Sequence, residues 1–113
     1  MKIDDILKKD SIIANLAGTN KEEVLREITG FLQELGLIKD KEILFNTLME
    51  REKLGSTGIG ENVAIPHGKS DELSQIVTVF GRSSNGVDFE SLDQKPVHFV
   101  CLVIAPSNST GQH

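Results

Sequence analysis

VHFVCLVIA, residues 97–105, is the longest apolar run in the chain, and Pro106 follows it directly. A run that hardly alternates with polar residues is typical of a strand covered on both faces of its sheet. Proline ends such a strand because it has no N–H to donate to the ladder. Residues 76–80 form a second run of this kind. The two runs predict core strands, with residues 97–105 as the central one.

Residues 11–36, which precede these strands, predict a short strand followed by an amphipathic helix. The strand is expected at residues 11–16, after a brief helical turn at the N-terminus. Thr19, with Glu22 three residues later, forms a capping box that marks the start of the helix. Apolar residues then recur with the 3.6-residue period between positions 24 and 35, and Gly36 ends the helix.

A second helix is predicted to begin after Asp40, which caps it, and to end at about residue 53. Leu44, Leu48 and Arg51 fall on one stripe of this helix because they are spaced at i, i+4 and i+7. The stripe therefore begins apolar and ends in a guanidinium. Residues 55–60, GSTGIG, predict a loop that is rich in glycine and carries two hydroxyl groups.

The order of these elements predicts an α/β fold, a single-domain sandwich of a mixed β-sheet flanked by helices, over residues 1–113. Residues 83–86, SSNG, predict a tight hairpin turn, because Asn-Gly supplies the positive φ angles it needs. A central strand this apolar needs cover on each face, yet only two substantial helices precede it and a polar tail follows. We therefore expect the C-terminal covering helices to be missing, and an uncovered sheet face through which copies would self-associate.

The composition excludes several classes of function. The chain has 113 residues, with 12 basic and 17 acidic side chains and a net charge of −5. Nucleic-acid binding is not expected, because it needs clustered Lys and Arg to neutralise phosphates. No apolar run approaches the length of a membrane span, and the start of the chain lacks the apolar region of a signal peptide. The single cysteine, Cys101, fits a reducing, cytoplasmic location.

His67, in the run GENVAIPHG at residues 60–68, is the candidate functional residue. Pro66 restricts the backbone before it, and Gly68 leaves space for another chain or a ligand after it. This arrangement indicates an imidazole presented to a partner. Near neutral pH most histidine side chains are neutral, and a neutral imidazole can accept a phosphoryl group.

The glycine-rich loop before His67 predicts an anion site. Backbone N–H groups near Gly58 and Gly60 could converge on phosphate oxygens, and Ser56 and Thr57 add hydroxyl donors. Arg51 could bind the same oxygens with two N–H groups. The alternative is that Arg51 is only a helix-end cation and the glycines only a turn. The residue pattern leaves both interpretations open.

Other motifs point elsewhere but are weaker. Val63 occupies the position at which both a P-loop and a dinucleotide fingerprint need a glycine. His98 is expected to be an ordinary strand histidine, and Cys101 a small buried hydrophobe without a lowered pKa. The acidic residues of 88–93 predict a solvated hairpin face. One metal-site hypothesis lacks ligand spacing; its members would be His67, His98, Cys101 and His113.

Glu52, a gap of six residues and the run IGENVAIPHG at 59–68 resemble a family signature. The family is the fructose/mannitol-type (type 2) IIA domain of the phosphoenolpyruvate-dependent sugar phosphotransferase system. Residues 81–93 resemble its fructose branch more than the mannitol or nitrogen-regulatory branches. The resemblance implies a phosphocarrier in which His67 accepts a phosphoryl group from the histidine-containing phosphocarrier protein HPr. His67 would then pass it to a cysteine of a IIB domain, and so drive uptake of fructose or a related sugar through the membrane IIC permease.

The same resemblance implies roles for two more residues. Arg51 matches the arginine that contacts the phosphate, and His113 matches a second active-site histidine. No cofactor and no metal are implied. An alternative within the family is a nitrogen-regulatory IIA protein, in which phosphorylation of His67 controls binding to regulatory partners. A further alternative is a small α/β domain in which Pro66, His67 and Gly68 are only structural.

Overall fold

The computed structural model describes residues 12–107, which form two helices and six strands in one sheet. The elements in chain order are β1 (Ile12–Ile13), α2 (Lys21–Glu34), α3 (Lys41–Lys53), β2 (Gly58–Gly60), β3 (Val63–Ala64), β4 (His67–Ser70), β5 (Val77–Val87) and β6 (Val97–Pro106). The predicted strand at 11–16 is thus shorter than expected. The helical turn predicted before it lies outside the described residues.

The central strand of the sheet is β6, as its apolar sequence predicts. It pairs antiparallel with β5 on one side and parallel with both β3 and β4 on the other. The outer strands are β1, parallel to β5, and β2, antiparallel to β3. The sheet is therefore mixed, and the predicted α/β class is confirmed.

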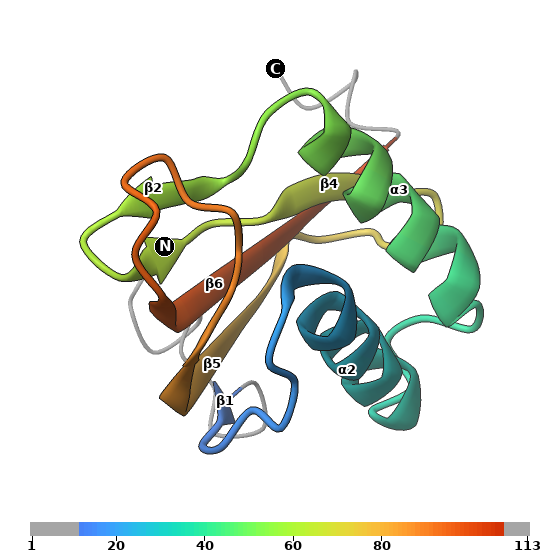
Figure 1. Cartoon of the computed structure of the whole chain (residues 1–113). Coiled ribbons are helices and arrows are strands. Elements are labelled where there is room, and N and C mark those ends of the chain that lie inside the picture. The colour runs from blue at the N-terminus through green and yellow to red at the C-terminus, as the bar shows by residue number, and fades with distance from the viewer. Residues whose placement is uncertain (1–11, 108–113) are drawn as a thin grey trace.

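Both helices lie on the same side of the sheet (Figure 1). On that side, alternate residues of β6 such as Leu102 and Ile104 are completely buried, and they join the core with apolar residues of α2 and α3. On the other side, Val103 is half-buried and Phe99 is 54% exposed. Within residues 12–107 the second face has no helical cover. Self-association through this face stays a prediction.

No helix within residues 12–107 is long and apolar enough to cross a membrane.

The helix predictions are confirmed except for the first cap. The N-cap of α2 is Asn20, whose side chain accepts a hydrogen bond from Glu23 N. The carboxylate of Glu23 in turn accepts from the backbone N–H and the hydroxyl of Thr19. The predicted pair of Thr19 and Glu22 is wrong by one residue. Asparagine caps a helix as well as threonine does, and here its side chain reaches the free N–H groups of the first turn.

The carboxylate of Glu23 makes the cap of α2 sensitive to pH. Hydrogen bonds from the Thr19 backbone N–H, and then from its hydroxyl, lower the pKa of Glu23 below its ordinary value. Since the folded state prefers the ionised form, this stabilisation is complete above the unfolded-state pKa and is lost as the pH falls through the folded-state pKa. Glu23→Gln should therefore lower the free energy of unfolding at neutral pH but not in acid.

Urea unfolding of the wild type and Glu23→Gln over a series of pH values measures this difference. Glu22→Gln is the matched control, because Glu22 lies in the same turn and has no contact with Thr19 among the described hydrogen bonds. Equal pH dependence of the two variants would contradict the role assigned to Glu23.

The predicted hairpin turn at residues 83–86 is also wrong. These residues belong to β5, and the ladder with β6 shifts register between Arg82 and Val87. Gly86 does adopt a positive φ of 91°, but it lies within a bulge, where its N–H donates a hydrogen bond to Ser83 Oγ. The connection to β6 is instead formed by residues 88–96. Its acidic side chains are exposed, as predicted: Asp88, Glu90 and Asp93.

Candidate functional site

The segment that carries His67 is a strand interrupted at one point. Strands β3 and β4 follow the same edge of β6 in one register, with Val63 opposite Phe99 and His67 opposite Val103. Between the two strands, Pro66 has no N–H, and its carbonyl accepts from Val103 N at 3.0 Å. The backbone N–H of Ile65 turns to Thr57 O at 3.0 Å instead. The break places His67 at the first position of β4, with an exposed side chain.

The two ring nitrogens of His67 have different partners. Nδ1 lies 3.0 Å from the carbonyl oxygen of Ile65, and Nε2 lies 3.3 Å from Nε of Arg51. A carbonyl can only accept and a guanidinium can only donate, so these contacts assign the hydrogen to Nδ1 and the lone pair to Nε2. The nucleophilic nitrogen of an exposed imidazole therefore lies beside a fixed positive charge.

Arg51 reaches His67 from the last turn of α3. Leu44 and Leu48 on the same stripe are buried, so the prediction of an apolar stripe that ends in a guanidinium is confirmed. Nη1 of Arg51 donates to Gly55 O at 3.0 Å, which fixes the guanidinium over the loop after the helix. Among the described residues only Nε and Nη1 are engaged, so the remaining N–H groups could bind an anion near Nε2 of His67.

The loop predicted to bind phosphate uses its donors inside the fold. Ser56 Oγ donates to Phe89 O at 2.8 Å and accepts from Gly58 N at 3.0 Å. The Thr57 hydroxyl donates to the buried carboxylate of Glu52. Each hydroxyl has one hydrogen to give, so Ser56, Thr57 and the Gly58 amide are not free donors in this structure. For these three residues the prediction is corrected, while for Gly60 it stays a prediction.

Two glycines of the predicted site serve packing. Residues 58–60 form β2 rather than a loop. A Cβ at Gly68 would lie 3.3 Å from Leu48 Cδ2 and 3.4 Å from Thr47 Cγ2, so the space beside Gly68 is occupied by α3 and not by a partner. Gly58 is more restricted still, because a Cβ there would lie 2.3 Å from Ser91 Oγ.

Gly58→Ala should destabilise the protein by about 1–3 kcal/mol, the usual range for overpacking in a tight site. Ser91→Gly in the same chain should recover part of this loss, since it removes two of the three atoms that crowd the new methyl group. Urea unfolding measures both. The control is Gly30→Ala in α2, where an added Cβ has no atom within 4 Å and should stabilise by about 0.4–1 kcal/mol. A Gly58→Ala protein as stable as the wild type would contradict this packing.

The described hydrogen bonds connect neither His98 nor Cys101 to the imidazole of His67. His98 Nδ1 is 2.8 Å from Ser83 O, which fits the ordinary strand histidine that the sequence predicts. Cys101 is half-buried, and burial raises the pKa of its thiol, which agrees with the expectation of no lowered pKa. His113 lies outside the described residues. Within residues 12–107, no group of three or more His, Cys, Asp or Glu side chains could hold a metal ion.

The family described as "Phosphoenolpyruvate-dependent sugar phosphotransferase system, EIIA 2" matches residues 5–113. The chain belongs to this family. The fructose-specific EIIABC component of the sugar phosphotransferase system of Bacillus subtilis is 38% identical to it over 113 residues, which are 100% of this chain and 18% of that protein. The chain thus spans less than a fifth of that relative.

Two solved structures are similar in fold to this EIIA 2 domain. The nitrogen regulatory protein IIA-Ntr from Neisseria meningitidis is 35% identical with a TM-score of 0.82, over 98% of this chain and 75% of that one. Enzyme IIA-Mtl of Escherichia coli, solved in complex with phosphorylated enzyme IIB-Mtl, is 27% identical with a TM-score of 0.75, over 94% and 74% of the two chains. The fructose-specific relative, at 38% identity, and IIA-Ntr, at 35%, are thus similar to this EIIA 2 domain to nearly the same degree.

The side chains behind this EIIA 2 site include an ion pair that no local sequence pattern predicts. Glu52 is buried at the end of α3 and forms an ion pair with Lys21 at 3.0 Å. Glu52 is the first residue of the motif that indicated the family. The motif marked this position as functionally relevant, but it did not predict the contact with Lys21. Lys21 carries no such signal, because a lysine in the first turn of an amphipathic helix is usually solvated.

Proposed function

We propose that this protein is a phosphocarrier that accepts a phosphoryl group on Nε2 of His67. The observation that carries the proposal is the pair of contacts on the imidazole, with Ile65 O at Nδ1 and the Arg51 guanidinium at Nε2. The donor would be HPr carrying phosphohistidine, and the acceptor a cysteine of a IIB domain. The family and the relatives named above support this assignment.

In the proposed reaction the lone pair of Nε2 attacks phosphorus, and the N–P bond of the donor breaks as the new one forms. Because Nδ1 keeps its hydrogen, the phosphorylated ring carries a positive charge, which the Ile65 carbonyl stabilises. Arg51 balances the negative charge of the phosphoryl oxygens through its free N–H groups. Transfer to a thiolate returns the ring to its neutral form. No proton has to leave or join His67 in either step.

The surface near the proposed site suits contact with another protein. Leu54, which follows the last turn of α3, is 84% exposed, and Ile65, two residues before His67, is 36% exposed. Exposed aliphatic side chains close to a reactive group are common at protein–protein contacts. A partner that covers them would also exclude water from the phosphoryl group during transfer.

The test is incubation of the purified protein with phosphoenolpyruvate, the first enzyme of the system and HPr. Labelled phosphate should bind to the protein in a form that acid removes and alkali does not, as expected for phosphohistidine. Nuclear magnetic resonance of the imidazole nitrogens should place the phosphorus on Nε2. Absence of label with all three components present, when a known IIA domain is labelled in parallel, would refute the proposal.

A nitrogen-regulatory role is the second candidate, and the 35% identity to IIA-Ntr with a TM-score of 0.82 favours it. The chemistry at His67 would be the same, but phosphorylation would control the binding of regulatory partners. Adding a purified fructose-type IIB domain to the labelled protein separates the two. Rapid transfer of the label to the IIB cysteine supports sugar uptake, whereas retention on His67 supports regulation.

A further inference from the structure

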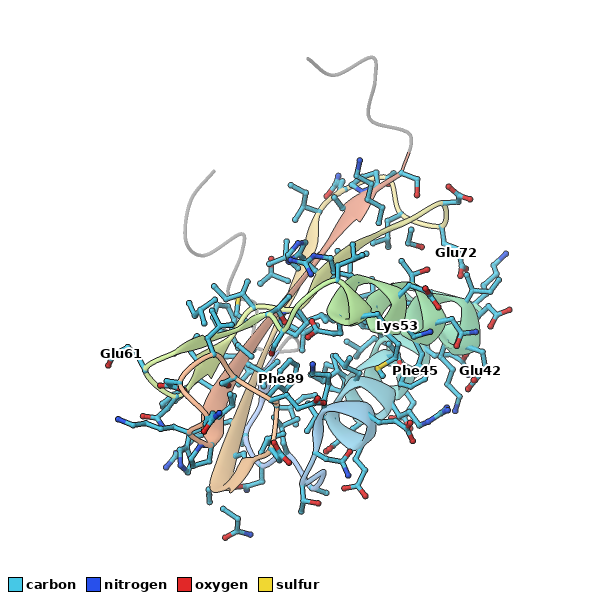
Figure 2. The ribbon with its side chains drawn as sticks, turned by 45° about the horizontal axis from the view of Figure 1, so that its top comes forward. Glu42, Phe45, Lys53, Glu61, Glu72 and Phe89 are labelled. Carbon is cyan, nitrogen blue, oxygen red and sulfur yellow. The ribbon has the colours of Figure 1, made fainter. Side chains whose placement is uncertain are left out.

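Glu52 is an unusual residue for the interior of a protein. Its side chain is 2% exposed, and that of its partner Lys21 is 9% exposed. The Lys21 ammonium also lies 5.3 Å from the ring centroid of Phe89, which points into the interior in Figure 2. A buried ion pair adds little to the stability of the fold, because the desolvation cost of both charges offsets their attraction. A different reason for its presence lies in what else the Glu52 carboxylate binds.

The carboxylate of Glu52 holds Thr57 at two points. Its Oε1 accepts from the Thr57 backbone N–H at 3.0 Å, and its Oε2 accepts from the Thr57 hydroxyl. The ammonium of Lys21 also contacts Oε1 at 3.0 Å and so holds the carboxylate in place. Both the backbone and the side chain of Thr57 are therefore fixed to the end of α3.

From Thr57 the hydrogen bonds continue to the imidazole. Thr57 O accepts from Ile65 N at 3.0 Å, and Ile65 O lies 3.0 Å from Nδ1 of His67. A second branch begins at the same helix turn, where Arg51 donates to Gly55 O and Gly55 N donates to Glu52 O, each at 3.0 Å. Both partners of His67 are thus held by the segment that Glu52 fixes.

We propose that Lys21, Glu52 and Thr57 are positioning residues for His67. They touch neither the imidazole nor the phosphate, but they fix the Ile65 carbonyl where it receives the Nδ1 hydrogen. The Ile65 carbonyl then keeps the lone pair on Nε2, beside Arg51. This inference rests on the proposed function for its catalytic consequence, while its effect on the imidazole tautomer does not.

Two pairs of variants test the proposal. Thr57→Val removes the hydroxyl at nearly constant volume, and Thr57→Ser keeps it. Glu52→Gln removes the buried charge, and Glu50→Gln removes an exposed charge from the same end of α3, where Glu50 pairs with Lys53 at 2.9 Å. The tautomer of His67 is read from nitrogen chemical shifts in the unphosphorylated protein, and the rate from single-turnover phosphorylation at saturating HPr, per folded molecule.

Thr57→Val and Glu52→Gln should lower the population with hydrogen on Nδ1, and should slow phosphorylation by about 10- to 100-fold with little change in KM, since misplacement of about 1 Å acts on this scale. Thr57→Ser should restore both quantities. Glu50→Gln should stay within about twofold of the wild type, because exposed ion pairs contribute little. If Glu52→Gln does not fold, the threonine pair carries the test.

The proposal is overturned if Thr57→Val keeps both the wild-type tautomer and the wild-type rate, even if it unfolds more easily. That result would make Glu52 and Thr57 a stabilising contact and nothing more. Failure of the proposed function has another signature, because the wild type would then remain unphosphorylated whatever its tautomer.

Discussion

His67→Gln is expected to abolish phosphoryl acceptance from HPr, with a loss of about 10⁴-fold or more, the scale on which removal of an enzyme's nucleophile acts. Glutamine retains polarity and bulk but has no lone pair on nitrogen that can attack phosphorus. The side chain is exposed, so the fold should survive and the melting temperature should change little. Labelled phosphate in the acid-labile form, measured over time at a fixed concentration of HPr, reports the loss.

His98→Gln is the matched control for that experiment. His98 is also a strand histidine with Nδ1 near a backbone carbonyl, Ser83 O at 2.8 Å, but no arginine contacts its Nε2 among the described residues. The His98→Gln protein should be phosphorylated on His67 at the wild-type rate. Equal labelling of His67→Gln and the wild type would assign the phosphate to another residue and remove the basis of the proposed function.

Arg51→Ala is expected to reduce the rate of phosphorylation by about 10²–10³-fold, the usual effect of removing one preorganised donor from a site of developing charge. Arg51→Lys should lie between this variant and the wild type. Lysine restores the positive charge, but it cannot donate to both Nε2 of His67 and Gly55 O from a planar fork. The defect should appear in the rate at saturating HPr, measured by rapid quenching of a single turnover.

The control for Arg51 is Lys53→Ala. Lys53, labelled in Figure 2, is another cation in the last turn of α3, but it forms an exposed ion pair with Glu50. Its loss should leave the rate unchanged. A similar loss in Lys53→Ala would mean that general positive charge near the helix end, and not the geometry at His67, assists transfer.

Local sequence patterns were sufficient to predict the two helices and the central strand. The stripe of Leu44, Leu48 and Arg51 needed only the 3.6-residue period, and the burial of β6 needed only its apolar run. The cap of α2 was missed by one residue because Thr19 and Asn20 are both good capping residues. The bulge at residues 83–86 was missed because a glycine can also adopt a positive φ inside a strand, as Gly86 does, and there the partner strand decides the outcome.

The predicted anion loop shows a different kind of failure. Glycine and hydroxyl residues indicate that donors are present in residues 55–60, but not what accepts from them. In the fold, Ser56 meets a carbonyl of the connection before β6 and Thr57 meets a buried carboxylate. Both acceptors come from contacts that no local period or spacing encodes.

The sequence by itself determined the family and the central strand, and it predicted His67 and Arg51 as the reactive pair, because each depends on neighbouring residues and their spacing. Only the tertiary structure decided which nitrogen of His67 carries the lone pair, and it did so through Ile65 and Arg51. It alone decided that Lys21 and Glu52 meet in the interior. The physical reason is that hydrogen bonds and ion pairs join groups by distance in space, whereas sequence patterns record only order along the chain.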